Sequence, residues 1–456
     1  MSDAIQPAGV APARSRIARV QDVAEPNLLR DVFPYDAVPK ILFDGVIETP
    51  DPAPEFYITD TTFRDGQQAR PPYSVEQIVA LYTMLHRLGG PNGIIRQTEF
   101  FVYSDVDREA VRRCLALGYE FPEVTGWIRA VKSDLKLVSE MGIKETGILT
   151  SCSDYHIFHK LRKTRSQALE DYLAIAKGAL ELGLTIRCHL EDATRADFYG
   201  FVVPFVSRLM ELREQSGLSV KIRVCDTMGF GVPFPGVALP RSVPKLILGL
   251  RRECGVPPEC LEWHGHNDFH KVLANATAAW LYGCMYANGT LLGLGERTGN
   301  PPVEGLVMDY ISLKGNNGID TSVITEIADY FEHEIGYRIP ANYPFVGREF
   351  NSTRAGIHAD GLLKDEEIYN IFDTAKILGR PARVAVDKTS GSAGVAWWIN
   401  SYFKLANGRQ VSKQSDAVRK ITAWVDQQYV AGRNTSISDD ELAAQARLHM
   451  PEIATP

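Results

Sequence analysis

Residues 55–90 read E-F-Y-I-T-D-T-T-F-R-D-G-Q-Q-A-R-P-P-Y-S-V-E-Q-I-V-A-L-Y-T-M-L-H-R-L-G-G, a short β-rich run followed by an amphipathic segment. Ser74 and Gln77 are spaced as a capping-box pair at the start of a helix. The glycines at 89 and 90 end that helix, because glycine readily adopts the conformation of a helix C-terminus. The apolar residues that recur at helical spacing are Val75, Ile78, Val79, Tyr82 and Leu85. The stretch therefore predicts one strand followed by one helix.

The same pattern repeats further along the chain. Seven more β-like runs follow, beginning at residues 93, 123, 145, 184, 219, 260 and 289, and longer amphipathic segments separate them. Several runs are nearly continuous apolar stretches, which is typical of parallel strands buried on both faces. Strands that alternate with helices in this way predict a closed parallel barrel, the α/β fold known as the TIM (β/α)₈ barrel.

The chain of 456 residues is long enough for such a barrel and one further unit. Residues 1–22 are rich in Ala and Pro without a clear period, which predicts a flexible tail. Apolar pairs mixed with prolines at 23–54 predict an irregular but ordered arm. We expect the barrel to occupy 55–325. Beyond it the alternation is lost, and helical periodicity predicts a mainly helical C-terminal subdomain over 326–456 that contributes to the active site.

Composition argues against several classes of function. The formal net charge is −7 and no block of Lys and Arg stands out, so we expect neither nucleic-acid nor anionic-membrane binding. No apolar stretch approaches the roughly 20 residues of a membrane helix, and the N-terminus lacks the apolar region of a signal peptide. The seven cysteines are dispersed and form no C-x-x-C pair, which predicts reduced thiols and a cytoplasmic protein.

Polar side chains gather where the predicted strands end. Active sites of TIM barrels lie at the carboxyl ends of the strands, so this distribution predicts an active site on that face. Chance could place polar residues at some of these positions, because loops are polar, but it would not readily supply so many arginines, carboxylates and histidines together. The residues are Arg64, Asp65, Glu99, Arg129, Thr150, Ser151, His189, Glu191, Asp226, Thr227, His264, His266, Glu296 and Asn300.

The segment H-G-H-N-D at 264–268 follows the seventh run. His264 and His266 would point to the same side of an extended segment, so both could bind one metal ion. Two turn histidines without a metal would give the same motif, and the motif in isolation does not decide between the two. Asp65 would add a carboxylate and leave positions open for substrate. Mixed nitrogen and oxygen ligands predict Mn²⁺ or Mg²⁺, with Zn²⁺, Co²⁺ and Fe²⁺ as alternatives.

Two further features complete the predicted site. Arg64 carries a planar, permanently charged group suited to an enolate or carboxylate oxygen, although a structural ion pair with Asp60 or Glu99 is the alternative. The segment G-L-G-E-R-T-G-N at 293–300 lacks the spacing of a dinucleotide-binding fingerprint. Its glycines would instead let the backbone approach a ligand, with Asn300 offering an oxygen to the metal.

Together these motifs resemble the DRE-TIM metallolyases, and within them the acetyl-CoA-condensing branch of isopropylmalate, homocitrate, citramalate and Re-type citrate synthases. The resemblance covers roughly residues 55–375. Several motifs in the same order are far more specific than any one of them. The matching segments are D-T-T-F-R-D-G at 60–66, E-D-A-T-R-A-D at 191–197, D-T-M-G at 226–229, H-G-H-N-D at 264–268 and G-E-R-T-G-N at 295–300.

The resemblance implies a role for each matching position. Arg64 would stabilise negative charge on the reacting oxygens, and Thr227 would hold the carboxylate of a 2-keto acid. Glu99 and Glu191 would orient groups around the site. The implied metal ligands are Asp65, His264 and His266, with Asn300 at or near the metal.

The C-terminal subdomain contains a further matching segment, A-G-I-H-A at 355–359. In the family it carries a catalytic histidine, here His358, over the barrel, often the barrel of a partner subunit, and Tyr369 lies at the family's spacing behind it. The resemblance therefore implies a homodimer in which the C-terminal subdomain reaches the partner's barrel. From the residues alone, His358 would be interpreted as a helix-surface side chain.

Four segments are most similar to Re-type citrate synthases, which implies acetyl-CoA and oxaloacetate as substrates and citrate, an acid of the tricarboxylic acid cycle, as product. Position alone makes Arg129, Arg195 and His189 candidates to bind the second carboxylate of oxaloacetate. Two positions depart from the wider family: Gln67 replaces an acidic residue, and His189 a small hydroxyl residue. The four segments are L-R-D-V-F-P-Y at 29–35, R-P-P-Y-S-V-E-Q at 70–77, L-G-G-P-N-G-I-I-R-Q-T-E-F-F at 88–101 and T-G-W-I-R-A at 125–130.

Three alternatives remain open at this point. The same chemistry on another keto acid would give homocitrate, 2-isopropylmalate or citramalate. A lyase of the same superfamily would cleave a carbon–carbon bond, although the segment around His358 argues against it. A non-catalytic metal-binding barrel is the alternative from another class. The chain after the barrel is too short for the leucine-sensing domain of isopropylmalate synthases, so we do not expect feedback control by leucine.

Overall fold

The computed structural model describes residues 19–406 and 408–453. The chain divides into two compact units, of which the first ends at Ile319 and the second begins at Asp320. Most of the stretch predicted as a tail lies outside the described residues. Within its described part, the backbone N–H of Gln21 donates to the carbonyl of Gly200 over 2.9 Å.

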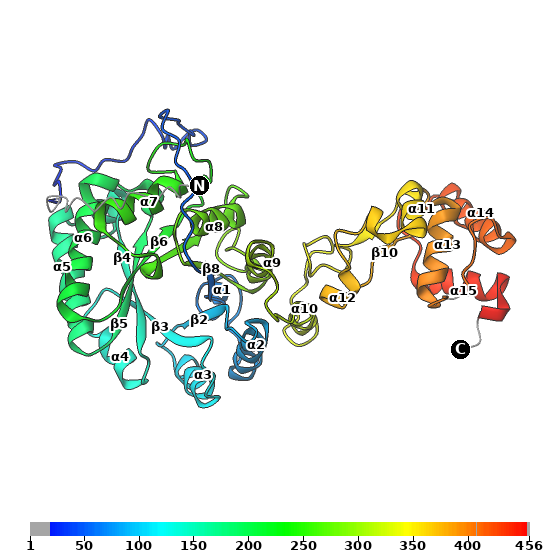
Figure 1. The fold of residues 1–456 in the computed structure, drawn as a ribbon, viewed down its shortest axis with the longest axis horizontal. Helices are drawn as coiled ribbons and strands as arrows, with labels where there is room; N and C mark the ends of the chain where they lie inside the picture. Colours follow the sequence, from blue (N-terminus) through cyan, green and yellow to red (C-terminus); the bar gives the residue numbers. More distant parts are fainter. Residues whose placement is uncertain (1–18, 407, 454–456) are drawn as a thin grey trace, which may run out of the picture. The chain divides into compact units, whose positions relative to one another are not determined.

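Eight parallel strands close into a barrel in sequence order, β1 next to β2 and onward, with β8 pairing back to β1. Helices surround these strands in the first unit (Figure 1). The predicted TIM barrel is therefore confirmed. The strands are β1 Tyr57–Asp60, β2 Ile95–Phe100, β3 Glu123–Arg129, β4 Glu145–Ser151, β5 Thr185–Glu191, β6 Val220–Asp226, β7 Leu261–Gly265 and β8 Tyr286–Gly289.

The helices of this unit begin where the sequence supplies caps. Ser74, Ser104 and Thr164 each close a capping box, at the start of α2, α3 and α5. Two π-helical turns, η1 Tyr155–Lys160 and η3 Phe198–Val202, follow β4 and β5. The α-helices are α1 Asp65–Gln68, α2 Val75–Leu88, α3 Asp105–Ala116, α4 Asp134–Glu140, α5 Arg165–Glu181, α6 Val203–Ser216, α7 Val243–Cys254, α8 Val272–Leu281 and α9 Val303–Lys314.

The eighth strand differs from its prediction. We expected it to begin at residue 289, but β8 ends there, and the apolar run that follows forms the 3₁₀ turn η5 Leu291–Gly293. Leu292 has a φ of 57°, which no extended strand allows. The backbone N–H of Gly293 donates to the carbonyl of Thr290 over 3.1 Å and closes this turn. The leucines of this run are apolar because they are buried in a turn, and not because they belong to a strand.

The interior of the barrel also differs from its prediction. We expected apolar side chains on both faces of the strands, but only the outward faces are apolar. The outward faces are apolar, as Ile58, Ile186 and Ile222 illustrate, each with no measurable exposure. The inward faces of β2, β5, β6 and β7 carry charged side chains instead. Single-letter runs such as I-R-C-H and K-I-R-V-C conceal this alternation, because the charged residues occupy every second position.

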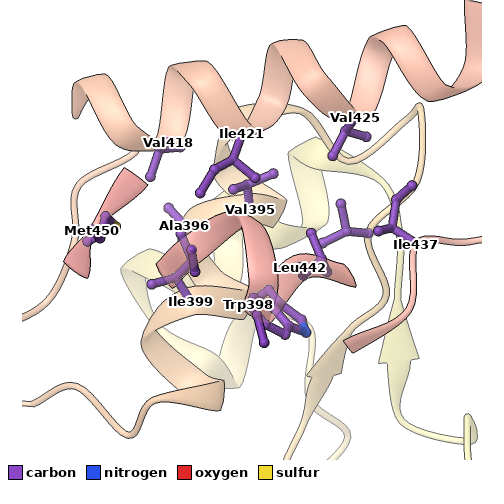
Figure 2. Close-up of a cluster of buried hydrophobic side chains, with 13 residues drawn as sticks. Val395, Ala396, Trp398, Ile399, Val418, Ile421, Val425, Ile437, Leu442 and Met450 are labelled. Atoms are coloured by element: carbon purple, nitrogen blue, oxygen red, sulfur yellow. The ribbon is translucent and has the colours of Figure 1, made fainter. Parts of the chain in front are cut away.

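The second unit has its own hydrophobic core, drawn in Figure 2. Trp398 and Ile399 of α13 pack with Ile421 of α14 and Leu442 of α15. A two-stranded parallel sheet of β9 Ser352–Thr353 and β10 Arg383–Val384 lies in the same unit. Its helices are α10 Val323–His333, α11 Gly356–Lys364, α12 Thr374–Leu378, α13 Gly391–Tyr402, α14 Asp416–Val430 and α15 Asp439–His449. None of the helices in the described residues is long and apolar enough to cross a membrane.

Candidate metal centre and active site

Three buried side chains at the carboxyl ends of the strands form a cluster with the composition of a metal site. Asp65 follows β1, His264 lies in β7 and His266 follows it. One possible ligand atom from each lies within 4.8 Å of those of the other two. Nε2 of His264 lies 3.1 Å from Oδ2 of Asp65. The three residues predicted as ligands therefore converge, as a single cation would require.

The orientation of His264 is set by a residue that the sequence analysis did not single out. Its Nδ1 lies 2.7 Å from Oδ1 of Asn288, whose Nδ2 donates to Oγ1 of Thr59 over 2.9 Å. Since Oδ1 can only accept, Nδ1 of His264 carries the proton. Nε2 therefore keeps its lone pair and faces the cluster, which is the tautomer that a metal ligand needs.

The charge of Asp65 is also favourable for a cation. Burial alone would raise the pKa of this carboxyl, but the neighbouring Arg64 and His264 outweigh burial and hold the pKa well below its usual range. Nη1 of Arg64 lies 2.7 Å from Oδ1. For His266, burial lowers the pKa to about 4, so its imidazole is neutral near pH 7.

Two buried polar atoms beside the cluster have no hydrogen-bond partner among the described residues, namely Nδ1 of His266 and Oδ1 of Asn300. The amide of Asn300 is held by its other end, since Nδ2 donates to Oδ2 of Asp65 over 3.2 Å and to the carbonyl of Gly265 over 3.3 Å. Leaving a buried acceptor unpaired costs about 1–3 kcal/mol. The carboxylate of Asp65 and the two imidazoles fit a divalent cation. The Asn300 amide differs from its prediction, because its nitrogen and not its oxygen is directed at Asp65, so it supports a ligand and does not itself offer an oxygen to the metal.

Gly295 makes room for the Asn300 amide, and we expect Gly295→Ala to weaken metal binding by about 10-fold or more. A Cβ at position 295 would lie 1.9 Å from Oδ1 of Asn300, so the amide would have to move. The measurement is the Kd for Mn²⁺ of the purified protein. Gly178→Ala is the control, because a Cβ there meets only Cδ1 of Leu135 at 3.4 Å. Equal Kd values for both variants and the wild type would contradict the placement of Asn300.

Glu99 lies behind Arg64 and anchors it. Its Oε1 accepts from Nε of Arg64 over 2.8 Å, so the ion pair considered as an alternative for this arginine exists alongside the contact to Asp65. Nε2 of His189 lies 3.4 Å from the other oxygen. Burial and the charge of Arg223 lower the pKa of His189 to about 3, so its imidazole is neutral. A Cβ at Gly147 would lie 2.5 Å from this Nε2, so the side chains are closely packed.

Glu191, at the end of β5, faces a histidine that the sequence analysis missed. Nδ1 of His156 lies 3.2 Å from Oε2 of Glu191, and Nζ of Lys160 lies 3.2 Å from the same oxygen. Ser151 also donates to it. Burial would raise the pKa of Glu191, but the hydrogen bond and charge of His156 outweigh it and lower the pKa to about 2. The sequence signal that could have identified these residues is the segment H-I-F-H-K at 156–160, whose basic side chains follow the fourth strand.

The remaining barrel residues have firm partners of their own. Thr227 Oγ1 accepts from the backbone N–H of Asp192 over 2.8 Å. Nε of Arg195 lies 3.0 Å from Oδ1 of Asp192, and the guanidinium lies 4.0 Å from the ring centre of Tyr155. Arg129 binds Asp134 through two nitrogens, at 2.9 and 3.0 Å. Both arginines are therefore already neutralised by carboxylates.

Gln67, one of the two positions that depart from the wider family, lies in the short helix α1. Nε2 of Gln67 donates to the carbonyl of Phe63 over 2.6 Å, and its Oε1 accepts from the backbone N–H of Tyr73 over 3.0 Å. The amide thus joins the chain before α1 to the chain after it. An acidic side chain at this position could accept from Tyr73 but could not donate to Phe63.

His358 and Tyr369 lie in the second unit and contact each other, with ring centres 4.4 Å apart. Nδ1 of His358 lies 3.2 Å from Oγ1 of Thr353. The ring of Tyr369 packs on Gly361, where a Cβ would lie 2.5 Å from Cε2. Tyr369 is 46% exposed, and exposed isoleucines flank the pair at 357, 368 and 371. The structure therefore brings together the two residues that the resemblance implied.

Glu304 binds the turn that precedes the glycine-rich segment 293–300. Its burial leads us to expect that the free energy of unfolding depends on pH. Burial raises its pKa to about 7 from 4.5, while its Oε2 accepts from the backbone N–H of Leu292. Because the native state holds this proton more tightly than the unfolded state, the free energy of unfolding should fall as pH rises from about 4.5 to 7, by up to about 3 kcal/mol. Glu304→Gln should remove that contribution.

The corresponding measurement is urea unfolding of the wild type and Glu304→Gln at pH 5 and pH 8. We expect the variant to gain stability relative to the wild type at pH 8 and to differ little at pH 5, where Glu304 is protonated in the native state. A difference in free energy of unfolding that is the same at both pH values would contradict the assignment.

Comparison with known proteins agrees with this geometry. The HMGL-like family matches residues 55–331, which include every strand of the barrel. The chain is 62% identical over 435 residues to a citrate (Re)-synthase of Syntrophus aciditrophicus, covering 95% of this chain and 69% of that one. It is 55% identical over 436 residues to a citrate (Re)-synthase of Clostridium kluyveri, covering 95% of this chain and 96% of that one.

Among solved structures, the HMG-CoA lyase of Bacillus subtilis superimposes with a TM-score of 0.51 and 21% identity, covering 64% of this chain and 97% of that chain. That likeness concerns the fold alone. The family match and the sequence identities go further, because they extend over most of the chain. The protein therefore belongs to the HMGL-like family, in the branch that contains the citrate (Re)-synthases.

Proposed function

We propose that this protein condenses acetyl-CoA with oxaloacetate, using water to release citrate and CoA, and that a divalent metal ion at Asp65, His264 and His266 supports the reaction. The observation that carries the proposal is the convergence of these three buried ligands beside Arg64, in a chain 62% and 55% identical to citrate (Re)-synthases. We expect Mn²⁺ or Mg²⁺, because the ligands are nitrogen and oxygen without thiolate.

The bound metal would act as a Lewis acid toward the keto acid. The side chains around it would stabilise the developing negative charge and hold the substrate. Arg64 is held by Glu99 and Asp65 in a fixed orientation, and its Nη2 makes no hydrogen bond to another described residue. Nη2 can therefore donate to the oxygen on which negative charge develops. Thr227 would hold the carboxylate next to the keto group.

The proton must leave the methyl group of acetyl-CoA, and His358 with Tyr369 is the proposed pair for this step. Their contact supports the proposal, because the tyrosine ring and Thr353 both restrict the imidazole. We propose that the pair acts on the barrel of a partner subunit in a homodimer. The exposed isoleucines around the pair support this, since an apolar surface of that kind is suited to association.

His189 is a stronger candidate than the two arginines for the second carboxylate of oxaloacetate. Arg129 and Arg195 would each have to give up a carboxylate partner, Asp134 or Asp192, to bind substrate. Nε2 of His189 has only a longer contact of 3.4 Å to Oε2 of Glu99, and the ring is neutral. A neutral imidazole can donate one hydrogen bond without such an exchange.

All seven cysteines are unpaired, which supports a reducing compartment such as the cytoplasm.

The test is CoA release by the metal-loaded protein with acetyl-CoA and, in separate reactions, oxaloacetate, 2-oxoglutarate, 2-oxoisovalerate and pyruvate. We expect kcat/KM for oxaloacetate to exceed those for 2-oxoisovalerate and pyruvate by at least about 100-fold, since a site built for a second carboxylate rejects analogues that lack it. For 2-oxoglutarate we expect a smaller margin of roughly 10- to 200-fold, because its second carboxylate is present but one methylene farther from the keto group. Preference for another keto acid would identify that acid as the substrate and contradict the assignment of oxaloacetate. CoA release with none of the four would contradict the proposed reaction.

A further inference from the structure

The barrel interior contains a layer of buried polar side chains to which every strand contributes. TIM barrels usually fill this space with branched apolar residues. Burying so many charges costs several kcal/mol per ion before pairing, and apolar residues of similar volume would often serve stability equally well. The layer therefore calls for an explanation other than stability. Its members are Thr59, Gln97, Glu99, Thr125, Glu145, Arg187, Lys221, Arg223, Glu262 and Asn288.

One path through this layer begins at the proposed metal ligands. His264 donates through Nδ1 to Asn288, and Asn288 donates through Nδ2 to the hydroxyl of Thr59. That hydroxyl donates in turn to Oε1 of Glu262. The backbone carbonyl of Thr59 also accepts from Nδ2 of Asn288, over 3.2 Å, so two acceptors on Thr59 orient this amide. Glu262 supports that orientation, and with it the orientation of His264, by holding the Thr59 hydroxyl as an acceptor toward Asn288.

A second path joins the same carboxylate to Arg64. Arg223 spans two carboxylates, with Nη2 2.9 Å from Oε1 of Glu262 and Nη1 2.9 Å from Oε1 of Glu99. Arg64 donates through Nε to that same oxygen of Glu99 and contacts Asp65 through Nη1. Asp65 then lies 3.1 Å from Nε2 of His264, so the two paths close into one ring of contacts.

From this ring we infer that Glu262 and Arg223 are positioning residues for the metal centre and for Arg64. Neither reaches the solvent, since their exposures are 1% and 0%, so they act through other side chains. The Glu262 carboxylate fixes Asn288 through Thr59, and Arg223 fixes Glu99. The inference rests on the proposed metal site and extends it to side chains deep in the barrel, on β6 and β7.

Mn²⁺ binding to the full-length protein without other ligands provides the test, since it does not depend on which keto acid reacts. We expect Glu262→Gln to weaken the Kd for Mn²⁺ by about 10- to 100-fold, the usual effect of residues that orient metal ligands. Glu145→Gln is the matched control. It removes the same charge inside the same barrel, beside Lys221 and Arg187, but outside the ring.

Thr59→Val provides a second, milder variant if Glu262→Gln fails to fold. It removes the hydroxyl that joins Asn288 to Glu262 while keeping the side-chain volume, and we expect it to weaken Mn²⁺ binding alone but to add little to Glu262→Gln. Equal Mn²⁺ affinity in Glu262→Gln, Thr59→Val and Glu145→Gln, or fully additive effects of the first two, would overturn the inference. A wild-type protein that binds Mn²⁺ but makes no citrate, with the variants still weakened in Mn²⁺ binding, would instead contradict the proposed function and leave this inference standing.

Discussion

Asp65→Ala and His264→Ala are expected to abolish high-affinity Mn²⁺ binding and to reduce the turnover of oxaloacetate by about 1000-fold or more, because a bound metal contributes several kcal/mol to the stabilisation of charge. Each substitution removes one of three ligands that lie within 4.8 Å of one another. Asp65 also contacts Arg64, so its loss disturbs two groups at once. The measurements are Mn²⁺ titration and CoA release on the same preparations.

A matched control for these variants is Asp309→Ala, which removes a carboxylate that contacts Thr277, on the helices outside the barrel. We expect normal Mn²⁺ binding and turnover from it. If both site variants keep metal affinity and turnover at wild-type values, the cluster is not the metal centre. Loss of turnover with unchanged metal affinity would assign these residues to the chemistry but not to the metal.

His358→Ala should reduce kcat by about 100- to 10,000-fold, the usual contribution of a general acid or base, while leaving the Kd for Mn²⁺ unchanged. The reason for the separation is that His358 is proposed to move a proton and not to bind the metal, and it is held within its own unit by Thr353 and Tyr369. Tyr369→Phe should have a smaller effect on kcat, because it keeps the ring that packs beside the imidazole. Steady-state kinetics and Mn²⁺ titration together provide the measurement.

Mixing the two inactive variants tests whether the site is shared between subunits. If Asp65→Ala and His358→Ala subunits exchange, half of the dimers contain one barrel with intact ligands facing one intact His358, and roughly a quarter of wild-type activity should return. Each variant mixed with itself is the control. No recovery after verified subunit exchange would place both residues of a functional site on the same chain.

The barrel and the convergence of Asp65, His264 and His266 could be predicted from the sequence for a definite physical reason. Strand–helix alternation constrains the barrel, and once the barrel is known the carboxyl ends of its strands must meet on one face. Asp65, His264 and His266 are each adjacent to a strand end, so their convergence followed from topology. His358 and Tyr369 could be named as a pair only from the resemblance. No periodic pattern in the sequence predicts that a helix residue contacts a residue several positions beyond the helix.

Other features depend on contacts that a linear pattern does not contain. The run after Gly289 is apolar like a strand, but it forms a turn in which Leu292 has a positive φ and the N–H of Gly293 donates to the carbonyl of Thr290. Glu262 and Arg223 occupy alternate positions of apolar runs, and their pairing across neighbouring strands depends on barrel register. His156 lies on a π-helical turn after β4, a local geometry that sequence spacing does not predict.

The most direct test of the central claim is thiol release from acetyl-CoA and oxaloacetate by one preparation before chelation, after chelation and after Mn²⁺ is returned, with citrate measured as the product. The proposed site predicts CoA and citrate in equal amounts, loss of both when the metal is removed, and recovery when it is restored. Citrate formation that continues unchanged in the metal-free protein would contradict a metal-dependent condensation at Asp65, His264 and His266.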